Sequence, residues 1–267
     1  MVNGHYVIDA HCHIYPEKIA ARAIAGTSAF YDIEFPNIGT VEDLIKCGKE
    51  AGYDHFIVQS VATTPKQVES INEFIASSVN ENKSLMTGLG TLHPDCDNMQ
   101  FQVEKIKSLG LRGVKLHPDI QQFKIDDYRC LKIYELCERE GLPILMHTGD
   151  SRYDYSNPNR LLPILQIYTS LTIVGAHLGG YSLWEEAAEK LKGIDNFYVD
   201  CSSSFPFIGN DRVKKLIETY GVDKVIFGTD YPMWELKNEI IDFFKMGFDK
   251  ESCEKMLNVN ARKVYID

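Results

Sequence analysis

The chain lacks the features that mark secreted, membrane-spanning and nucleic-acid-binding proteins. Its seven cysteines form no CxxC pair and no regular framework, which favours a reducing cytosol over a disulfide scaffold. No apolar run approaches the roughly 20 residues that cross a bilayer, and we expect no signal peptide, because the first expected strand starts within a few residues of Met1. The net charge of −10 argues against a nucleic-acid partner, since phosphate binding needs clustered Lys and Arg. We expect a cytoplasmic protein that binds neither membranes nor nucleic acid.

The length and composition are those of one globular domain. The 267 residues, 44% hydrophobic and 25% charged, come close to the ~250 residues typical of an eightfold α/β barrel. No linker or low-complexity tract divides the sequence. We therefore expect residues 1–267 to form a single domain.

Strand-like runs alternate with helix-like runs along the whole chain. Eight short runs rich in Val, Ile, Leu, Phe or Tyr have the character of strands: 6–13, 55–62, 85–93, 111–117, 142–148, 171–178, 196–202 and 224–230. Segments with helical spacing lie between them, and several end on Gly, as a helix C-cap does. An interval of 30 residues separates His117 from His147 and His147 from His177, which one strand, one helix and two loops would fill. The pattern predicts an α/β fold of the (β/α)8 TIM-barrel type, with a doubly wound open sheet as the alternative.

The segment between the first two expected strands is longer than one helix needs. Residues 14–54 carry Phe30, Tyr31, Phe35 and Pro36 and leave the carboxyl end of the first strand. We interpret the segment as an insertion after strand 1 that forms a lid or pocket wall. An ordinary surface excursion would have the same composition.

Imidazole and carboxylate groups stand at the ends of the expected strands. They are His11, His13, His147, His177 and Asp230. Side chains alternate along a strand, so His11 and His13 point to one side, and Asp9 points there one layer below, where it could orient a ligand through a hydrogen bond. Five polar groups at one end of an apolar barrel are costly to bury without a cation, and barrel enzymes react at this end. The pattern therefore predicts a divalent-metal site.

Lys115 and His117 are candidates for the surroundings of this site. In GVKLHP, Val114 and Leu116 suit the side that faces the helices, which turns Lys115 and His117 inward. Lys115 could pair with Asp230, bind a substrate carboxylate, bridge two metals as a carbamate, or form a structural ion pair. His93, in its LHPD context, better fits a strand-to-loop turn.

Two loops carry further candidates for substrate contact. Arg152, with Tyr153 and Tyr155, follows the fifth expected strand and could form a cationic or aromatic clamp. Met233 and Trp234 follow the eighth and could form an apolar wall. Solvated loop positions would look the same in sequence. The candidate substrate-binding residues are Lys115, His117, Arg152 and Trp234.

These residues and their phrases carry a family resemblance. An HxH on the first strand, a His on the fifth and on the sixth, and an Asp on the eighth resemble the amidohydrolase superfamily of metal-dependent barrels. The phrases IDAHCHIYP, GVKLHP, MHTG, AHLGG and FGTDYP, and the ending LNVNARKVYID, are similar to the amidohydrolase-related branch, which also holds aminocarboxymuconate-semialdehyde decarboxylase and resorcylate decarboxylases. The resemblance spans residues 8 to 265.

The resemblance implies a set of roles. His11, His13, His147 and Asp230 would hold one metal, and His177 would act beside it as a catalytic residue. Lys115 falls where binuclear relatives carry a bridging carbamylated lysine, so a second metal is not ruled out. Such a donor set suits zinc first, with manganese, iron or cobalt also compatible. Relatives are often dimers, which makes a homodimer an expectation.

Two reactions of a small-molecule substrate fit the same groups. In the leading hypothesis, a metal-activated water hydrolyses an amide, lactone or ester, Asp230 takes and returns the proton, and His177 stabilises the developing oxyanion. In the alternative, the protein is a decarboxylase of an aromatic or enol acid, with Asp230 or His177 delivering a proton to carbon. A metal-binding fold without catalysis is a third possibility, which would need a coordinatively closed site.

Overall fold

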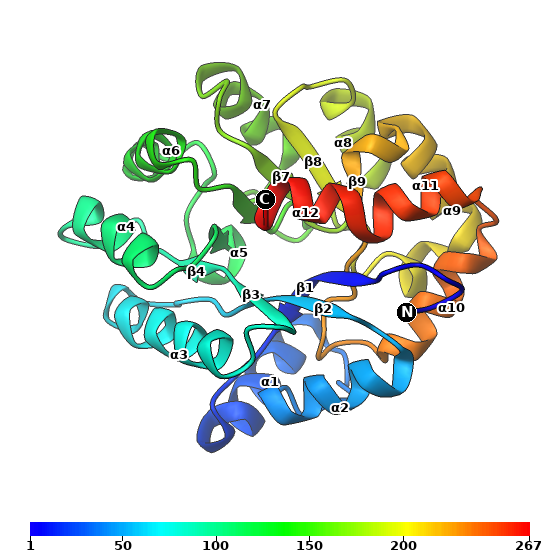
Figure 1. Ribbon diagram of the computed structural model, residues 1–267. Helices are drawn as coiled ribbons and strands as arrows, with labels where there is room; N and C mark the ends of the chain where they lie inside the picture. The colour runs from blue at the N-terminus through cyan, green and yellow to red at the C-terminus, as the bar shows by residue number, and fades with distance from the viewer.

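A ring of parallel strands forms the centre of the molecule, and helices surround it (Figure 1). The computed structural model describes all residues from Met1 to Asp267. The strands are β1 (Ile8–His13), β2 (His55–Gln59), β3 (Met86–Gly88), β4 (Gly90–Thr91), β5 (Val114–Leu116), β6 (Ile144–Met146), β7 (Ile173–Gly175), β8 (Phe197–Asp200) and β9 (Val225–Ile226). Each strand pairs in parallel with its sequence neighbour in two hydrogen-bonded groups, β1 to β3 and β4 to β9.

Hydrogen bonds outside these ladders close the ring. The Leu89 N–H donates to the Val58 carbonyl at 2.9 Å, and the Gly90 N–H to the Gly113 carbonyl at 2.9 Å, so β3 and β4 are two parts of one bent third strand. After β9, the Asp230 N–H donates to the His11 carbonyl at 2.9 Å, which joins the last strand to the first. The (β/α)8 barrel is therefore confirmed, and the open sheet is wrong.

Helices follow the strands in the order that the repeat predicts. Around the ring they are α2 (Val41–Ala51), α3 (Val68–Glu81), α4 (Met99–Ser108), α6 (Tyr128–Glu140), α7 (Pro158–Ile167), α8 (Trp184–Leu191), α9 (Phe205–Tyr220) and α10 (Leu236–Lys245). Helix α6 shows how local sequence sets the bounds. The Asp127 side chain accepts the Arg129 N–H at its start, and Gly141 ends it with φ 65°, a left-handed conformation that glycine adopts without steric cost. None of the helices has the length and apolar character that a bilayer crossing requires.

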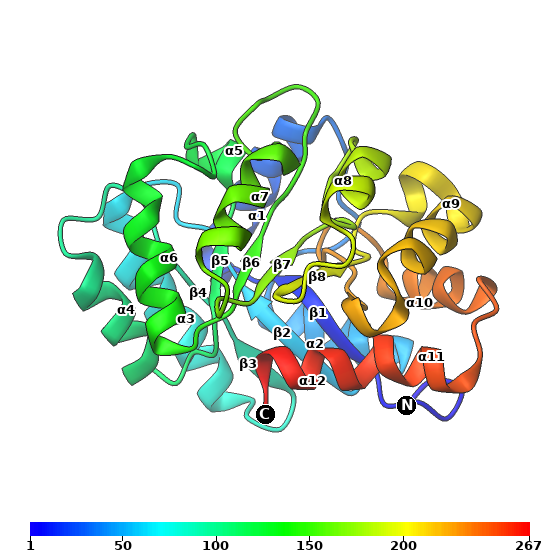
Figure 2. The ribbon, with the colours of Figure 1, turned by 90° about the horizontal axis from the view of Figure 1, so that it is seen from above.

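The insertion after strand 1 contributes an extra helix. Of residues 14–54, α2 is the regular barrel helix, capped by the Thr40 side chain, whereas α1 (Glu17–Tyr31) and residues 32–39 are additional. Figure 2 shows α1 near the short helix α5 (Pro118–Gln121), on the side of the ring opposite the two chain termini. The additional segment thus lies at the carboxyl ends of the strands, as a lid or pocket wall should.

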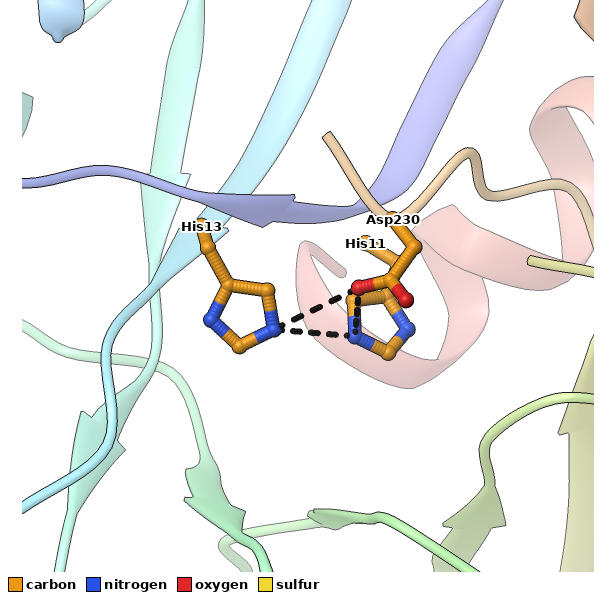
Figure 3. Close-up of side chains that lie close together, drawn as sticks. All are labelled: His11, His13 and Asp230. Carbon is orange, nitrogen blue, oxygen red and sulfur yellow. Dashed lines mark hydrogen bonds and ion pairs between the residues drawn. The ribbon is translucent and has the colours of Figure 1, made fainter. Parts of the chain in front are cut away.

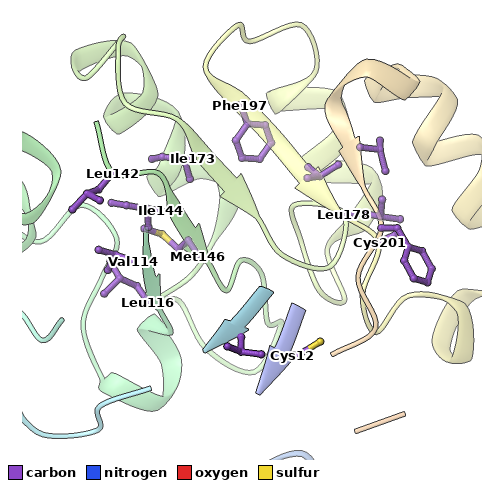
Figure 4. Close-up of a cluster of buried hydrophobic side chains, with 14 of the residues drawn as sticks. Cys12, Val114, Leu116, Leu142, Ile144, Met146, Ile173, Leu178, Phe197 and Cys201 are labelled. Carbon is purple, nitrogen blue, oxygen red and sulfur yellow. The ribbon is translucent and has the colours of Figure 1, made fainter. Parts of the chain in front are cut away.

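Two apolar clusters pack the barrel. The larger one lies between strands and helices, and Figure 4 shows part of it, with Val114 and Leu116 beside Ile144 and Met146 of the next strand. The smaller one includes Ile8, Ile57, Leu89, Leu145, Val174 and Ile226 from the strands, together with Ala261 and Tyr265 of α12 (Asn260–Tyr265). Helix α12, which follows α11 (Lys250–Glu254), therefore covers the amino-terminal end of the barrel and leaves the carboxyl end for the site.

Candidate metal centre

His11, His13 and Asp230 meet at the carboxyl end of the barrel. His11 and His13 are both on β1 and point the same way, with their Nε2 atoms 3.3 Å apart. The Asp230 Oδ1 atom lies 3.3 Å from Nε2 of His11 and 3.5 Å from Nε2 of His13 (Figure 3). Three potential ligand atoms, from the first strand and from the loop after the last strand of the ring, therefore face one another.

The spacing of these atoms fits a bound divalent metal. In a tetrahedral site with bonds of about 2.0–2.2 Å, neighbouring ligand atoms lie roughly 3.4 Å apart. The measured separations of 3.3 to 3.5 Å match this value. The nitrogens of the buried His11 and the partly exposed His13 and the carboxylate oxygen of Asp230 lie around one point and form the kind of donor set that binds a divalent cation.

A carboxylate on β8 orients His11. The Asp200 Oδ2 atom lies 2.9 Å from His11 Nδ1, which places a proton on Nδ1 and leaves Nε2 as the free donor atom of the ring. Burial alone would raise the pKa of Asp200, but His11, His177 and the Ser202 hydroxyl lower it to about 2. Sequence analysis missed Asp200, although it ends the run NFYVD as Asp230 ends its own run.

Asp9 has a different partner from the one expected. Its Oδ1 atom accepts the backbone N–H groups of His11 (3.1 Å) and Thr229 (2.9 Å), and its Oδ2 atom accepts the Thr229 hydroxyl at 2.6 Å. Asp9 therefore ties β1 to the last strand and does not orient a ligand ring. The parity argument gave the correct side, but the backbone of the neighbouring strand is closer than any imidazole.

Asp230 is held by a short chain of hydrogen bonds. The Ser203 hydroxyl donates to Asp230 Oδ2 at 2.7 Å, and the Trp234 indole N–H donates to the Ser203 oxygen at 2.8 Å. Trp234, a predicted substrate-binding residue, thus uses its polar atom to support Asp230 through Ser203. Burial raises the pKa of Asp230, but the neighbouring His11, His177 and His13 outweigh burial and lower it, which keeps the carboxylate ionised.

His147 and His177 lie together beside the group of three. The His177 Nε2 atom is 3.1 Å from His147 Nδ1, and the other nitrogen of His177 lies 3.1 Å from the Ser202 carbonyl oxygen. His147 is not within the close group that His11, His13 and Asp230 form, so its role as a ligand stays a prediction. Burial lowers the pKa of His177 to about 4, so the ring is neutral at physiological pH.

His117, Asp119 and His147 form a second close group. His147 Nε2 lies 3.4 Å from Asp119 Oδ2, and both side chains are buried. The rings of His117 and His147 stack, with centroids 3.9 Å apart and 7° between planes. Lone pairs of stacked parallel rings lie in separate planes and do not converge on one cation, so this group suits orientation of His147 by a carboxylate better than a second metal. Sequence analysis missed Asp119, the last residue of the second LHPD.

Lys115 contacts the candidate ligands themselves. Its Nζ atom lies 3.0 Å from His11 Nε2, and the side chain is fully buried inside the barrel, as the alternation of GVKLHP predicted. Burial lowers its pKa to about 8, although the carboxylates of Asp230 and Asp200 partly offset that effect. Lys115 is not among the residues that line the adjoining pocket.

Four of the predicted strand-end residues lie just beyond their strands. His117 and His147 follow β5 and β6 directly, whereas His177 and Asp230 stand further into their loops. His177 and Asp230 have φ of 58° and 67°, left-handed values that take the chain out of the strand. His93 accepts the Asp95 N–H at 3.2 Å, which agrees with its interpretation as a turn residue.

A small pocket opens onto this centre. It is lined by nine residues and lies directly beside His177 and Asp230. Polar groups of His147, His177, Ser203 and Asp230 line it, and the remaining lining residues are Tyr31, Ile33, Tyr181, Phe207 and Met233. The insertion supplies Tyr31 and Ile33, as expected of a pocket wall, whereas Tyr181 was not foreseen.

The predicted clamp residue Arg152 is already paired. Its guanidinium makes a fork with Asp150 (3.0 and 2.7 Å) and donates to the Phe30 carbonyl at 2.7 Å. It also lies 4.9 to 5.3 Å from the ring centres of Phe30, Tyr31 and Tyr153. Arg152 therefore fastens the end of α1 to the loop after β6, and its role in substrate binding stays a prediction.

The fold and this site together fit a metal-binding protein built on a parallel barrel. The chain belongs to the amidohydrolase family, whose sequence model matches residues 8–266. It is 25% identical over 236 residues to the 2-amino-3-carboxymuconate-6-semialdehyde decarboxylase of Dictyostelium discoideum, covering 72% of this chain and 64% of that relative. The chain thus spans less than two thirds of the relative's length.

Solved structures share the fold over nearly the whole chain. An uncharacterised TIM-barrel protein from Bordetella bronchiseptica has a TM-score of 0.81 and 20% identity, covering 97% of this chain and 98% of its own. A dihydroxybenzoic acid decarboxylase from Polaromonas sp., with bound manganese and the inhibitor 2-nitroresorcinol, has a TM-score of 0.74 and 16% identity, covering 97% and 96%. At these identities the likeness establishes the barrel.

Proposed function

We propose that the protein is a metal-dependent decarboxylase that removes carbon dioxide from a small aromatic or enol carboxylic acid. The observation that carries the proposal is the lining of the pocket, where the rings of Tyr31, Tyr181 and Phe207 stand beside His177 and Asp230. Aromatic side chains pack well against a planar substrate.

The names of the relatives favour the same reaction. The relative from Dictyostelium discoideum and the structure from Polaromonas sp. are both called decarboxylases. For this reason decarboxylation, the alternative in sequence analysis, replaces hydrolysis as the leading function.

In this proposal His11, His13 and Asp230, joined by His147, hold one divalent metal. Such a cation supplies a Lewis acid that binds substrate oxygen atoms and stabilises negative charge on them. Manganese, present in the Polaromonas protein, joins zinc as a candidate for this site. Asp200 keeps His11 in the ligating tautomer through its contact with Nδ1.

Asp230 and His177 would move the proton. Breaking the bond between the ring carbon and the carboxylate leaves its electron pair on that carbon, which takes a proton as carbon dioxide departs. The ionised Asp230, fixed by the Ser203 hydroxyl at 2.7 Å, would first accept a proton from a hydroxyl group of the substrate or from water and would then pass it to this carbon. The neutral His177 ring, whose Nδ1 lies beside the Ser202 carbonyl, directs Nε2 toward the same space.

Labelled substrates test the reaction. The protein is stripped of metal, reloaded with Mn²⁺ or Zn²⁺, and incubated with a panel of aromatic and enol acids carrying ¹³C in the carboxyl group. We expect labelled carbon dioxide from at least one acid, lost in the stripped protein and in Asp230→Asn. Incorporation of ¹⁸O from labelled water into products of amides, lactones or esters, with no labelled carbon dioxide, would establish hydrolysis and refute the proposal.

A further inference from the structure

Tyr31 brings a hydroxyl group from the insertion to the wall of the pocket. It is the last residue of α1, and its side chain lines the cavity beside His147 and Tyr181. Its ring centre lies 6.3 Å from that of His147 and 5.9 Å from that of Tyr181, with an edge-on contact to the latter. The only hydrogen-bond partner of its hydroxyl group in the protein is Nε2 of His117, at 2.8 Å.

The backbone fixes the direction of that hydrogen bond. The Ile120 N–H donates to His117 Nδ1 at 3.3 Å, as part of the cap of α5. A ring nitrogen that accepts a hydrogen bond carries no proton, so the proton of the neutral His117 ring is on Nε2. His117 Nε2–H therefore donates to the Tyr31 oxygen, and the Tyr31 proton is not used in this contact.

The position of Tyr31 is fixed from the other side by Arg152. The guanidinium donates to the carbonyl of Phe30, the neighbouring residue, at 2.7 Å. Its other hydrogen bonds are to Asp150, a buried side chain in the loop after β6. The Phe30 ring stacks on Tyr153 at 5.5 Å. The hydroxyl of Tyr31 is thus held in place before a ligand arrives, which reduces the entropy cost of binding.

We propose that Tyr31 is a substrate-binding residue that donates a hydrogen bond to an anionic oxygen of the bound acid. The inference rests on the substrate class proposed above. The oriented phenol adds a neutral donor to a pocket whose other lining residues include the negatively charged Asp230. In this proposal Tyr31, which belongs to the insertion, favours a ring that carries an anionic oxygen. His117 leaves the Tyr31 proton available to the pocket by donating its own hydrogen bond to the Tyr31 oxygen.

Binding of two probes of the same shape tests this role. Benzoate and nitrobenzene are isosteric, but only benzoate carries a negative charge that accepts a strong hydrogen bond. Dissociation constants for both are measured by calorimetry with the metal-loaded protein, with Tyr31→Phe and with Tyr128→Phe. Tyr128 is 80% exposed and does not line the pocket, which makes it the matched control. Thermal unfolding of each variant verifies the fold.

We expect Tyr31→Phe to weaken benzoate binding by roughly tenfold or more, because a charge-assisted hydrogen bond is lost, and to leave nitrobenzene binding and the Tyr128→Phe control unchanged. Equal weakening of both probes would assign Tyr31 a packing role and overturn the inference. Unchanged benzoate binding in Tyr31→Phe, or no benzoate binding by the natural protein, would overturn it too. Benzoate binding that depends on Tyr31, in a protein that releases no carbon dioxide from any acid, would refute the proposed reaction and leave the inference standing.

Discussion

Asp200→Asn should weaken metal binding while it preserves the barrel. Asn has the shape of Asp, and its carbonyl oxygen can still accept the backbone N–H groups of His177 (3.1 Å) and Ser202 (3.0 Å). Its NH2 group, however, would then stand where Asp200 Oδ2 lies now, 2.9 Å from His11 Nδ1. Both the NH2 group and the Nδ1–H group donate hydrogen bonds, so no hydrogen bond forms between them. The ring bonds to this amide by moving its proton to Nε2, which removes the lone pair that faces Asp230 and His13. The Ser202 hydroxyl oxygen, 3.0 Å from Nδ1, favours the original tautomer, so the change is partial.

The expected loss follows from this change of tautomer. Removing a partner that orients a metal-bound histidine costs about 10–100-fold in metal affinity, or roughly 1.4–2.7 kcal/mol. The remaining ligand atoms of His13 and Asp230 keep their positions, so binding should weaken and not vanish. Metal-free protein is titrated with Mn²⁺ and with Zn²⁺ in competition with a colorimetric chelator, which gives the dissociation constant directly. Circular dichroism and thermal unfolding measure the integrity of the fold.

Asp195→Asn provides the matched control. Asp195 is exposed and precedes the same strand, β8, at its opposite end, so the substitution removes an equal charge without touching His11. Its metal affinity should stay within about twofold of the natural protein. A dissociation constant for Asp200→Asn within about twofold of the natural value, or equal losses in both variants, would refute the argument from tautomer control.

Two further predictions concern stability and the lid. Burial raises the pKa of the Glu239 carboxyl group well above its ordinary value, so the folded protein keeps this group protonated to higher pH than the unfolded chain does. The folded protein therefore loses stability as pH rises above the pKa of the unfolded chain. Glu239→Gln should raise the melting temperature near pH 8 but not near pH 4. Arg152→Gln removes the paired hydrogen bonds to the Asp150 carboxylate and the hydrogen bond to the Phe30 carbonyl. Because Arg152 is partly exposed, we expect the free energy of unfolding to fall by only about 1 kcal/mol, and amide hydrogen exchange at the end of α1 to become several-fold faster.

Each of these predictions has its own control. For Glu239, the exposed Glu218→Gln on α9 should give no pH-dependent gain, and a gain of equal size near pH 4 and near pH 8 for Glu239→Gln would contradict the titration argument. For Arg152, exchange in α6 should stay unchanged in the variant. Unaltered exchange at the end of α1 would mean that other contacts hold the lid.

The metal centre was readable in sequence because the strand repeat determines where strand ends meet. His11 and His13 were expected on one side from alternation alone, and they lie together. Asp230 was expected with them because it ends its own strand at the carboxyl end of the barrel, where barrel enzymes react. These inferences depend only on the regular alternation of strands and helices along the chain and on the closure of the strands into a ring.

The partners of these residues were not readable, because they depend on particular distances. Asp9 was expected to orient a ligand ring, but the backbone of Thr229 reaches it first. The role belongs to Asp200, whose strand was recognised without a reason to choose its last residue. Arg152 was expected to meet substrate, but its carboxylate partner lies two residues away and its carbonyl partner, Phe30, is 122 residues away. The sequence shows the nearby Asp150 but does not show that the same guanidinium also reaches the distant Phe30 carbonyl.

The closure of the ring between β1 and the segment after β9 couples cation binding to the integrity of the polypeptide. Two of the three converging donors come from residues 11 and 13 and the third from residue 230, and the Asp230 amide is bonded to the His11 carbonyl. A fragment cut short before the final barrel segment retains both imidazoles but has no carboxylate to complete the trio. One bound metal per chain in a purified preparation would therefore indicate that the chain includes Asp230 and that the first and last segments of the barrel are paired.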